Sequence, residues 1–315
     1  MNIAISTSSF DTMNEKLIHS LEKFGVNVKQ NPLGRRLTES EIIDHLNGID
    51  GLLAGLEPLN QKVFNKNPQL KAIARVGIGL DNVDLSSAQL FGIKVSNTPE
   101  APTNAVAEMT VAASLMLSRN VLSANEALHR KEWKKSIGVG LNGSEVLIIG
   151  YGRIGRRTAQ LLYGLGASIK VYDPNINQND IKDNEVFVNL ESGLKTADIV
   201  TLHASGTDII LGSKEFKIMK KGVIILNSSR SGLIDEDSFI DALLCDKVAS
   251  AWMDVFQNEP YKGRLTDFSQ ILLTPHMSTY TKKCRLDMEL CALKNLFYDL
   301  GIRETYKKVS NIWQV

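Results

Sequence analysis

Val146-Leu-Ile-Ile-Gly150-Tyr-Gly152-Arg-Ile-Gly155 is the stretch of this 315-residue sequence that decides its fold. The apolar residues at its start predict a buried strand, which runs directly into a Gly-x-Gly-x-x-Gly loop. A loop of this kind between a strand and a helix binds the pyrophosphate of a dinucleotide at the helix amino terminus. With 23 glycines in the chain the spacing alone is a weak signal, so its surroundings must support it.

The residues after the loop supply that support. A helix-compatible run, Arg156 to Leu165, ends at Gly166, and a second strand-like run, Ile169 to Tyr172, ends at Asp173. Asp173 follows the last glycine by 18 residues (173 − 155), near the place expected for an acid that binds the ribose hydroxyls. Neither Arg nor Lys follows in 174–178 to bind a 2′-phosphate, so we predict NAD rather than NADP. The alternative is a glycine-rich turn without a ligand.

Polar residues or glycine follow every strand candidate from residue 146 to 275. The candidates are Val146–Ile149, Ile169–Tyr172, Ile199–Leu202, Val223–Leu226, Val248–Met253 and Ile271–Leu273. They are followed by Gly150, Asp173, His203, Asn227-Ser-Ser-Arg230, Asp254 and Thr274-Pro-His276. In an open parallel sheet the carboxyl ends of the strands share one edge, where ligands bind. We therefore expect these residues to lie along a single edge.

Arg230, Glu259 and His276 are the candidate catalytic residues at that edge. Reduction of a 2-keto acid needs a proton donor at the carbonyl oxygen and a cation for the carboxylate. Histidine as a residue type exchanges protons near neutral pH, a glutamate beside it fixes the ring, and arginine grips a carboxylate with two hydrogen bonds. Taken singly, each has a plainer interpretation, as a loop histidine or a surface charge.

Residues 1 to 98 alternate strand and helix candidates, which predicts a small parallel α/β domain. The strand candidates are Ile3–Ser6, Val26–Lys29, Gly51–Ala54, Lys71–Val76 and Ile93–Ser96, and the helix candidates include Asn14–Phe24 and Asp84–Phe91. A last helix, Thr279–Leu300, carries the chain back to it, and the tail to Val315 completes it. We predict a doubly wound Rossmann domain for NAD (99–284) inserted in a smaller flavodoxin-like α/β domain that binds substrate (1–98 plus 285–315).

The loop Arg75-Val-Gly77-Ile-Gly79 follows the strand candidate Lys71–Val76. Glycines at alternate positions leave the amides of Val76 to Gly79 able to curl around an anion. A plain turn that ends in a cap at Asp84 explains the same residues. The sequence leaves these two interpretations open.

Two further segments also have two interpretations each. A long helix, capped by Thr103 or Asn104 and running through Val121, either contributes to a dimer contact or packs on its own domain. The charge run His129 to Lys135 is either a solvated helix face or a docking site for an anionic substrate.

The bulk composition excludes several classes of protein. The chain is 43% hydrophobic and 23% charged, with a net charge of +1, so we expect neither nucleic acid nor a membrane as partner. No apolar run is long enough to span a bilayer. The three cysteines lack metal-binding spacing and fit reduced thiols, so we expect no metal site and a cytoplasmic location.

With these residues in view, nearly the whole chain resembles the D-isomer-specific 2-hydroxyacid dehydrogenases, the family that includes D-3-phosphoglycerate dehydrogenase. The matching motifs are Arg75-Val-Gly-Ile-Gly-Leu-Asp-Asn-Val-Asp84, Asn97-Thr-Pro99, Ala107-Glu108, Gly150-Tyr-Gly-Arg-Ile-Gly155, Tyr172-Asp-Pro174, Asn227-Ser-Ser-Arg230, Asp235-Glu236, Met253-Asp-Val-Phe256, Glu259-Pro260 and Thr274-Pro-His276. So many motifs in the order of the family make the resemblance specific.

The resemblance implies a role for each site residue. Arg230 would bind substrate, and Glu259 and His276 would form the acid/base pair. The amides of Val76, Gly77, Ile78 and Gly79 would hold the substrate carboxylate, and Arg75 would be a further substrate-binding residue. The cofactor contacts would be Gly150, Gly152, Arg153, Ile154, Gly155, Asp173, His203, Ser229 and Asp254, the last near the nicotinamide amide. The resemblance also implies a homodimer and hinges near Thr98 and Cys284.

The chain departs from the family pattern at several positions. Ser231 and Ser278 stand where glycine is common, and the loop His203-Ala-Ser-Gly-Thr207 is short. Ala54-Gly-Leu-Glu57 lies where members that handle phosphate carry arginine, which weakens the case for a phosphorylated substrate. Because the chain ends at Val315, we expect no feedback through an added regulatory domain.

We therefore expect an NAD-dependent enzyme that interconverts a small D-2-hydroxy acid and its 2-keto acid, with phosphoglycerate dehydrogenase-like activity as the leading interpretation. A reductase of glyoxylate or hydroxypyruvate (a glycerate enzyme) is the first alternative. The second is a non-catalytic, NAD(H)-sensing protein like the corepressors of this fold. Formate oxidation is disfavoured, because that branch carries glutamine where Glu259 stands.

Overall fold

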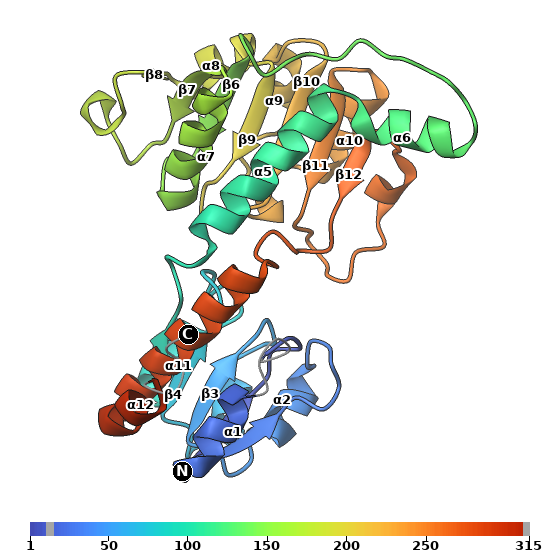
Figure 1. Ribbon diagram of the computed structural model, residues 1–315. Coiled ribbons are helices and arrows are strands. Elements are labelled where there is room, and N and C mark those ends of the chain that lie inside the picture. Colours follow the sequence, from blue (N-terminus) through green and yellow to red (C-terminus); the bar gives the residue numbers. More distant parts are fainter. Residues whose placement is uncertain (11–15, 311–315) are drawn as a thin grey trace. The chain divides into compact units, whose positions relative to one another are not determined.

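The computed structural model describes residues 1–10 and 16–310 (Figure 1). Contacts divide the chain into two compact units, Met1–Pro102 with Thr281–Val315, and Thr103–Tyr280. The domain boundaries predicted from sequence fall at neighbouring residues, 98 and 285, and stay a prediction. The first two residues of the predicted helix Asn14–Phe24 and the tail 311–315 lie outside the described residues.

The first unit is built on a five-stranded parallel sheet. Its strands are β1 (Asn2–Ile5), β2 (Asn27–Gln30), β3 (Gly51–Ala54), β4 (Ala72–Arg75) and β5 (Lys94–Ser96). The order β2-β1-β3-β4-β5 is that of flavodoxin-like folds, as predicted. The helices are α1 (Lys16–Lys23), α2 (Glu39–His45), α3 (Gln61–Lys66), α4 (Leu85–Leu90), α11 (Lys282–Asp299) and α12 (Arg303–Ser310).

Local sequence explains where these helices begin and what they bury. Thr38, Asn60 and Asp84 cap α2, α3 and α4 with their side-chain oxygens. The buried faces of these helices form one core cluster with β3 and β4. Helix α11 contacts β3, β4 and β5, so the end of the chain completes the unit that its beginning starts.

The second unit is built on a seven-stranded parallel sheet. Its strands are β6 (Glu145–Ile149), β7 (Ser168–Tyr172), β8 (Glu185–Phe187), β9 (Ile199–Leu202), β10 (Val223–Asn227), β11 (Val248–Met253) and β12 (Ile271–Leu273). The order β12-β11-β10-β9-β6-β7-β8 is the Rossmann order extended by one strand. The order reverses between β6 and β9, which is where such sheets bind dinucleotides. The predicted fold class is confirmed.

Helices cover both faces of this sheet. They are α5 (Pro102–Ser118), α6 (Val121–His129), α7 (Arg153–Gly164), α8 (Leu190–Thr196), α9 (Ser213–Ile218) and α10 (Glu236–Leu244). One core cluster joins α5 and α7 to alternate residues of β6, and a second joins α8, α9 and α10 to the residues between them. Figure 1 shows α5 crossing in front of the strands. Because both faces of β6 are covered, every side chain from Val146 to Ile149 is buried, which explains why its sequence is almost entirely apolar.

Two predictions about secondary structure were wrong in detail. The single helix expected through Val121 ends at Ser118, and Asn120 adopts a left-handed conformation (φ 52°) before α6 begins. Helix α5 also starts at Pro102, before the caps expected at Thr103 or Asn104. Strand β8, which was not predicted, is only three residues long, from Glu185 to Phe187, and lies at the edge of the sheet.

Three observations limit the chemistry of the described residues. None of their helices is long and apolar enough to cross a bilayer. No group of histidine, cysteine and acidic side chains among them is arranged to bind a metal ion. Cys245, Cys284 and Cys291 are all unpaired thiols.

Candidate active site

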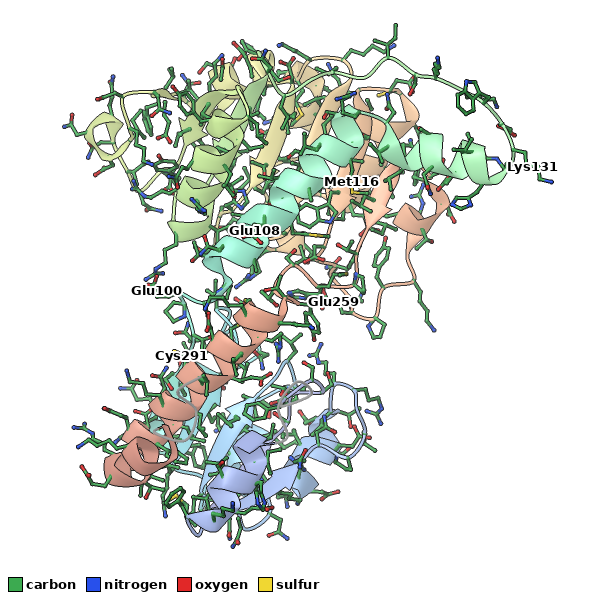
Figure 2. All side chains as sticks on the ribbon, in the orientation of Figure 1. Glu100, Glu108, Met116, Lys131, Glu259 and Cys291 are labelled. Atoms are coloured by element: carbon green, nitrogen blue, oxygen red, sulfur yellow. The ribbon has the colours of Figure 1, made fainter. Side chains whose placement is uncertain are left out.

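The carboxyl edge of the seven-stranded sheet collects the residues predicted for the site in the second unit. Gly150 follows β6, Asp173 follows β7, and His203 follows β9. Arg230, Asp254 and His276 lie just beyond the ends of β10, β11 and β12. Glu259, labelled in Figure 2, comes from the segment between β11 and β12. Because all neighbouring strands are parallel, the predicted common edge is confirmed.

The glycine loop has the geometry that its sequence predicts. Gly150 has φ 89°, and a Cβ there would lie 2.4 Å from the Ala204 backbone nitrogen. A Cβ on Gly155 would lie 2.1 Å from the Gly150 carbonyl oxygen, so this glycine lets α7 pack against the loop. Gly152 is the N-cap of α7 and faces open space. With no side chain at the cap, the amides of the first helical turn remain available to an anion.

Asp173 is held beside this loop by two backbone amides. Its Oδ2 accepts from the Tyr151 amide at 2.7 Å and its Oδ1 from the Asn175 amide at 2.9 Å. A carboxylate has about four lone-pair sites, so each oxygen keeps capacity for a ribose hydroxyl. Arg153 and Ile154 are the first two residues of α7, directly after Gly152. The residues present therefore fit a dinucleotide.

His203 links β9 to β6 next to Gly150. Its amide donates to the Ile149 carbonyl at 2.7 Å, and its Nε2 lies 3.0 Å from the Thr201 hydroxyl. Burial lowers the pKa of His203 to about 3, so the ring stays neutral at physiological pH. A neutral ring gives this position hydrogen-bonding capacity without charge.

Arg230 ends a turn that Asn227 organises. The fully buried Asn227 side chain accepts from the Ser229 amide and hydroxyl, both at 3.0 Å, and donates to the Arg230 carbonyl at 2.9 Å. The Arg230 guanidinium donates to the Ser229 carbonyl at 2.8 Å. A short 3-10 helix begins at Ser231. Asn227 was not predicted as a functional residue, although an asparagine directly after an apolar run is a turn signal.

Glu259 and His276 form a hydrogen-bonded pair. The His276 Nδ1 lies 3.0 Å from Oε2 and 3.1 Å from Oε1 of Glu259, and Oε1 also accepts from the Phe256 amide at 3.1 Å. A carboxylate only accepts, so Nδ1 carries the proton and Nε2 is left for a substrate. The exposed fractions of the His276 and Glu259 side chains are 43% and 23%, so the ring is the outer member.

The backbone of His276 is unusual. Its φ is 51°, a left-handed conformation that costs about 1 to 2 kcal/mol for residues other than glycine. Asp254, fully buried, accepts hydrogen bonds from residues on both sides of His276. This arrangement was not predicted, since Asp254 was expected only to contact the cofactor.

The loop Arg75 to Gly79 differs from the prediction. The Val76 amide donates to the Ala54 carbonyl and the Gly77 amide to the Arg75 carbonyl, both at 3.0 Å. The expected set of four available amides is therefore wrong at Val76 and Gly77. The first amide extends the pairing of β4 with β3, and the second closes a three-residue turn. Asp84 caps α4, as the plainer interpretation of this loop expected.

Gly77 packs directly against Arg75. A Cβ on Gly77 would lie 2.1 Å from the Arg75 Nη1, and Nη1 itself donates to the Val76 carbonyl. Burial raises the pKa of Glu57, and the nearby charge of Arg75 opposes this shift without cancelling it. Glu57 is fully buried and accepts from the Ser6 hydroxyl and from the Gly55 amide at 3.1 Å.

The charge run His129 to Lys135 contains several ion pairs. Glu132 pairs with Lys134 at 2.7 Å and with Arg130 at 3.5 Å, and Arg130 also approaches Glu126 at 3.9 Å. All four side chains are at least one third exposed. These contacts agree with a solvated charged segment.

Comparison with known proteins identifies the family of the chain that carries this site. The family model for the D-isomer specific 2-hydroxyacid dehydrogenase NAD binding domain matches residues 111–278. A glyoxylate reductase from Thermococcus litoralis is 32% identical over 272 residues, which are 81% of this chain and 82% of the relative. The chain belongs to the D-isomer specific 2-hydroxyacid dehydrogenase family. The predicted NAD cofactor is confirmed at the level of this family.

The similarity to other relatives and to solved structures of the family also extends over most of the chain. A D-3-phosphoglycerate dehydrogenase from Methanocaldococcus jannaschii is 33% identical over 285 residues, 87% of this chain and 53% of the relative. The chain thus spans about half the length of the phosphoglycerate dehydrogenases from M. jannaschii and Synechocystis that it matches. The crystal structure of a glyoxylate reductase from Paecilomyes thermophila matches with a TM-score of 0.83 at 27% identity, covering 94% of both chains.

Proposed function

We propose that this protein is an NAD-dependent oxidoreductase that interconverts a small D-2-hydroxy acid and its 2-keto acid. The observation that carries the proposal is the Glu259–His276 pair, joined at 3.0 Å on the sheet edge that also holds the glycine loop and Arg230. Family membership supports the same reaction class. A 2-hydroxy acid presents the groups that this set complements, namely a carboxylate and a hydroxyl that must lose a proton.

The chain's own residues divide the work of the reaction. NAD, when bound, supplies a hydride acceptor or donor for the substrate carbon. His276 Nε2 gives a proton to the carbonyl oxygen during reduction and takes it back during oxidation. Glu259 holds the ring in this orientation and stabilises the imidazolium that forms when Nε2 is protonated. Arg230 binds the carboxylate and polarises the carbonyl.

The cofactor contacts follow the geometry of the glycine loop. Open space at Gly152 and the first-turn amides of α7 suit the pyrophosphate, and the Asp173 carboxylate suits the ribose hydroxyls. Roles for His203 and Ser229 rest on their position at the same edge. For the substrate carboxylate, Ile78 and Gly79 remain the proposed amide donors of the first unit.

The substrate within this class remains a proposal with two branches. Phosphoglycerate dehydrogenase-like activity is supported by relatives that carry that name. The segment Ala54 to Glu57 favours the other branch, an unphosphorylated acid such as glycerate, hydroxypyruvate or glyoxylate. This segment carries no arginine or lysine for a phosphate, and its last residue, Glu57, is a buried carboxyl.

A homodimer in the cytoplasm is the proposed state of the protein. Apolar side chains are exposed on and after α6, including Leu128, Trp133 and Ile137, which supports a second copy covering this segment. The three unpaired thiols support a reducing compartment. Sedimentation velocity at micromolar concentration would show a mass near twice 34.8 kDa; a single species of 34.8 kDa would contradict the dimer.

The decisive experiment is oxidation of NADH with a panel of 2-keto acids. The panel contains hydroxypyruvate, 3-phosphohydroxypyruvate, glyoxylate and pyruvate, and NADPH serves as the cofactor control. We expect NADH-dependent turnover of at least one keto acid, and the ratio of kcat/KM for hydroxypyruvate to its phosphorylated form decides between the branches. NADH binding by calorimetry without turnover of any member would favour the sensor alternative and reject the enzyme.

A further inference from the structure

A single buried carboxylate holds the loop that carries His276. Asp254 Oδ1 accepts from the Thr274 hydroxyl at 2.6 Å and from the Met277 amide at 2.9 Å. Its Oδ2 accepts from the Ser278 amide at 3.0 Å and from the Ser278 hydroxyl. These four donors use the four lone-pair sites of the carboxylate. A nicotinamide amide at Asp254 would have to compete with them.

The direction of these bonds is fixed by Trp252. The Trp252 indole Nε1 can only donate, and it donates to the Thr274 hydroxyl at 2.8 Å. The Thr274 hydroxyl therefore accepts from Trp252 and turns its own hydrogen to Asp254. Trp252, Asp254, Thr274 and Ser278 are all buried, so water does not compete for these bonds.

The bonds enclose His276 from both sides. Thr274 precedes it by two residues, and Met277 and Ser278 follow it directly. His276 itself contributes only its amide, which donates to the Thr274 carbonyl at 2.9 Å, and its ring, which meets Glu259. The left-handed backbone of His276 is thus imposed by its neighbours, and this backbone directs the ring to Glu259.

Ser278 contributes more to this arrangement than the glycine that is common at its position could. A glycine would retain the amide bond to Oδ2 but lose the hydroxyl bond. We propose that Ser278 is a positioning residue, which acts through Asp254 to keep His276 in its left-handed conformation with Nδ1 on Glu259. The expected effect of Ser278 on kcat rests on the proposed function. Its expected effect on the stability of the loop rests on the loop geometry alone.

The test replaces Ser278 by alanine in the full-length protein. We expect kcat to fall on the order of 10-fold, less than the 10²-fold that a 1 Å misplacement can cost. The KM for NADH should stay within about twofold, because the glycine loop and Asp173 are untouched. Amide exchange of peptides covering 274–280, measured without cofactor, should become faster than in the wild type.

Two comparisons separate positioning from a general structural effect. Ser144→Ala removes another buried serine hydroxyl, which donates to the Gly140 carbonyl at 2.5 Å before β6, and should leave kcat and loop exchange unchanged. In a His276→Ala background, Ser278→Ala should cost nothing further, because its effect passes through His276.

The outcomes are distinguishable. Unchanged kcat and unchanged exchange in Ser278→Ala would overturn the proposal, as would a full further loss of rate in the His276→Ala background. If the wild-type chain turns over no keto acid, the proposed function fails. Exchange of 274–280 would then still decide whether Ser278 holds the loop.

Discussion

Two loops at the same sheet edge are shaped in opposite ways. The loop Gly150 to Gly155 owes its shape to missing side chains, since a Cβ at Gly150 or Gly155 would collide with backbone. The loop Thr274 to Ser278 owes its shape to added contacts, because a buried carboxylate distant in sequence binds residues on both sides of His276. The glycines of the first loop form a motif that the sequence shows, even though the backbone that excludes a Cβ at Gly150 belongs to Ala204. The bonds that shape the second loop correspond to no motif.

The largest expected effect is a loss of kcat in a variant of the second loop that keeps the shape of the loop. His276→Ala should lower kcat by about 10² to 10⁴, the usual contribution of a positioned acid/base group. The fold should be retained, because the His276 side chain makes none of the bonds to Asp254. Steady-state kinetics with the best keto acid and a thermal melt provide the two measurements. A nearly unchanged kcat would show that the proton donor is another group.

The next effect concerns the shape of the first loop. Gly150→Ala should destabilise the protein by about 3 kcal/mol, the sum of left-handed strain and overpacking against Ala204. Gly152→Ala is the matched control, because its φ of −74° suits alanine and its Cβ would meet open space. Urea denaturation should give nearly wild-type stability for the control, while its NADH affinity falls. Equal stability of the two variants would contradict the role of Gly150.

The smallest expected effect is a change in cofactor preference, and it tests Asp173, which binds the first loop through the Tyr151 amide. Asp173→Ala should weaken NAD binding relative to NADP by about 10-fold, since a carboxylate binds the ribose hydroxyls and repels a 2′-phosphate. Asp173→Asn keeps one oxygen that can accept from a backbone amide, so it separates loss of charge from loss of the loop contact. Calorimetric titration with both dinucleotides measures the ratio. A ratio that does not move would remove Asp173 from the ribose site.

The contrast between the loops also explains how far sequence reasoning reached. The strands other than β8, the glycine loop, Asp173 and the edge with Arg230, Glu259 and His276 follow from local patterns, namely apolar runs and the residues after them. The hydrogen bonds of Asp254 do not, because they join its carboxylate to groups 20 to 24 positions away. The same holds for the Val76 amide, whose partner, Ala54, lies on another strand.

Trp252 is an intrinsic fluorescent probe of the loop Thr274 to Ser278. Its indole is fully buried and bonded to Thr274, whereas Trp133 is 80% exposed and Trp313 lies outside the described residues. With Trp133 and Trp313 replaced by phenylalanine, the remaining tryptophan fluorescence comes from Trp252, whose indole N–H is hydrogen-bonded to the Thr274 hydroxyl. Its wavelength and lifetime then give an optical record of the loop as substrates and cofactor are added.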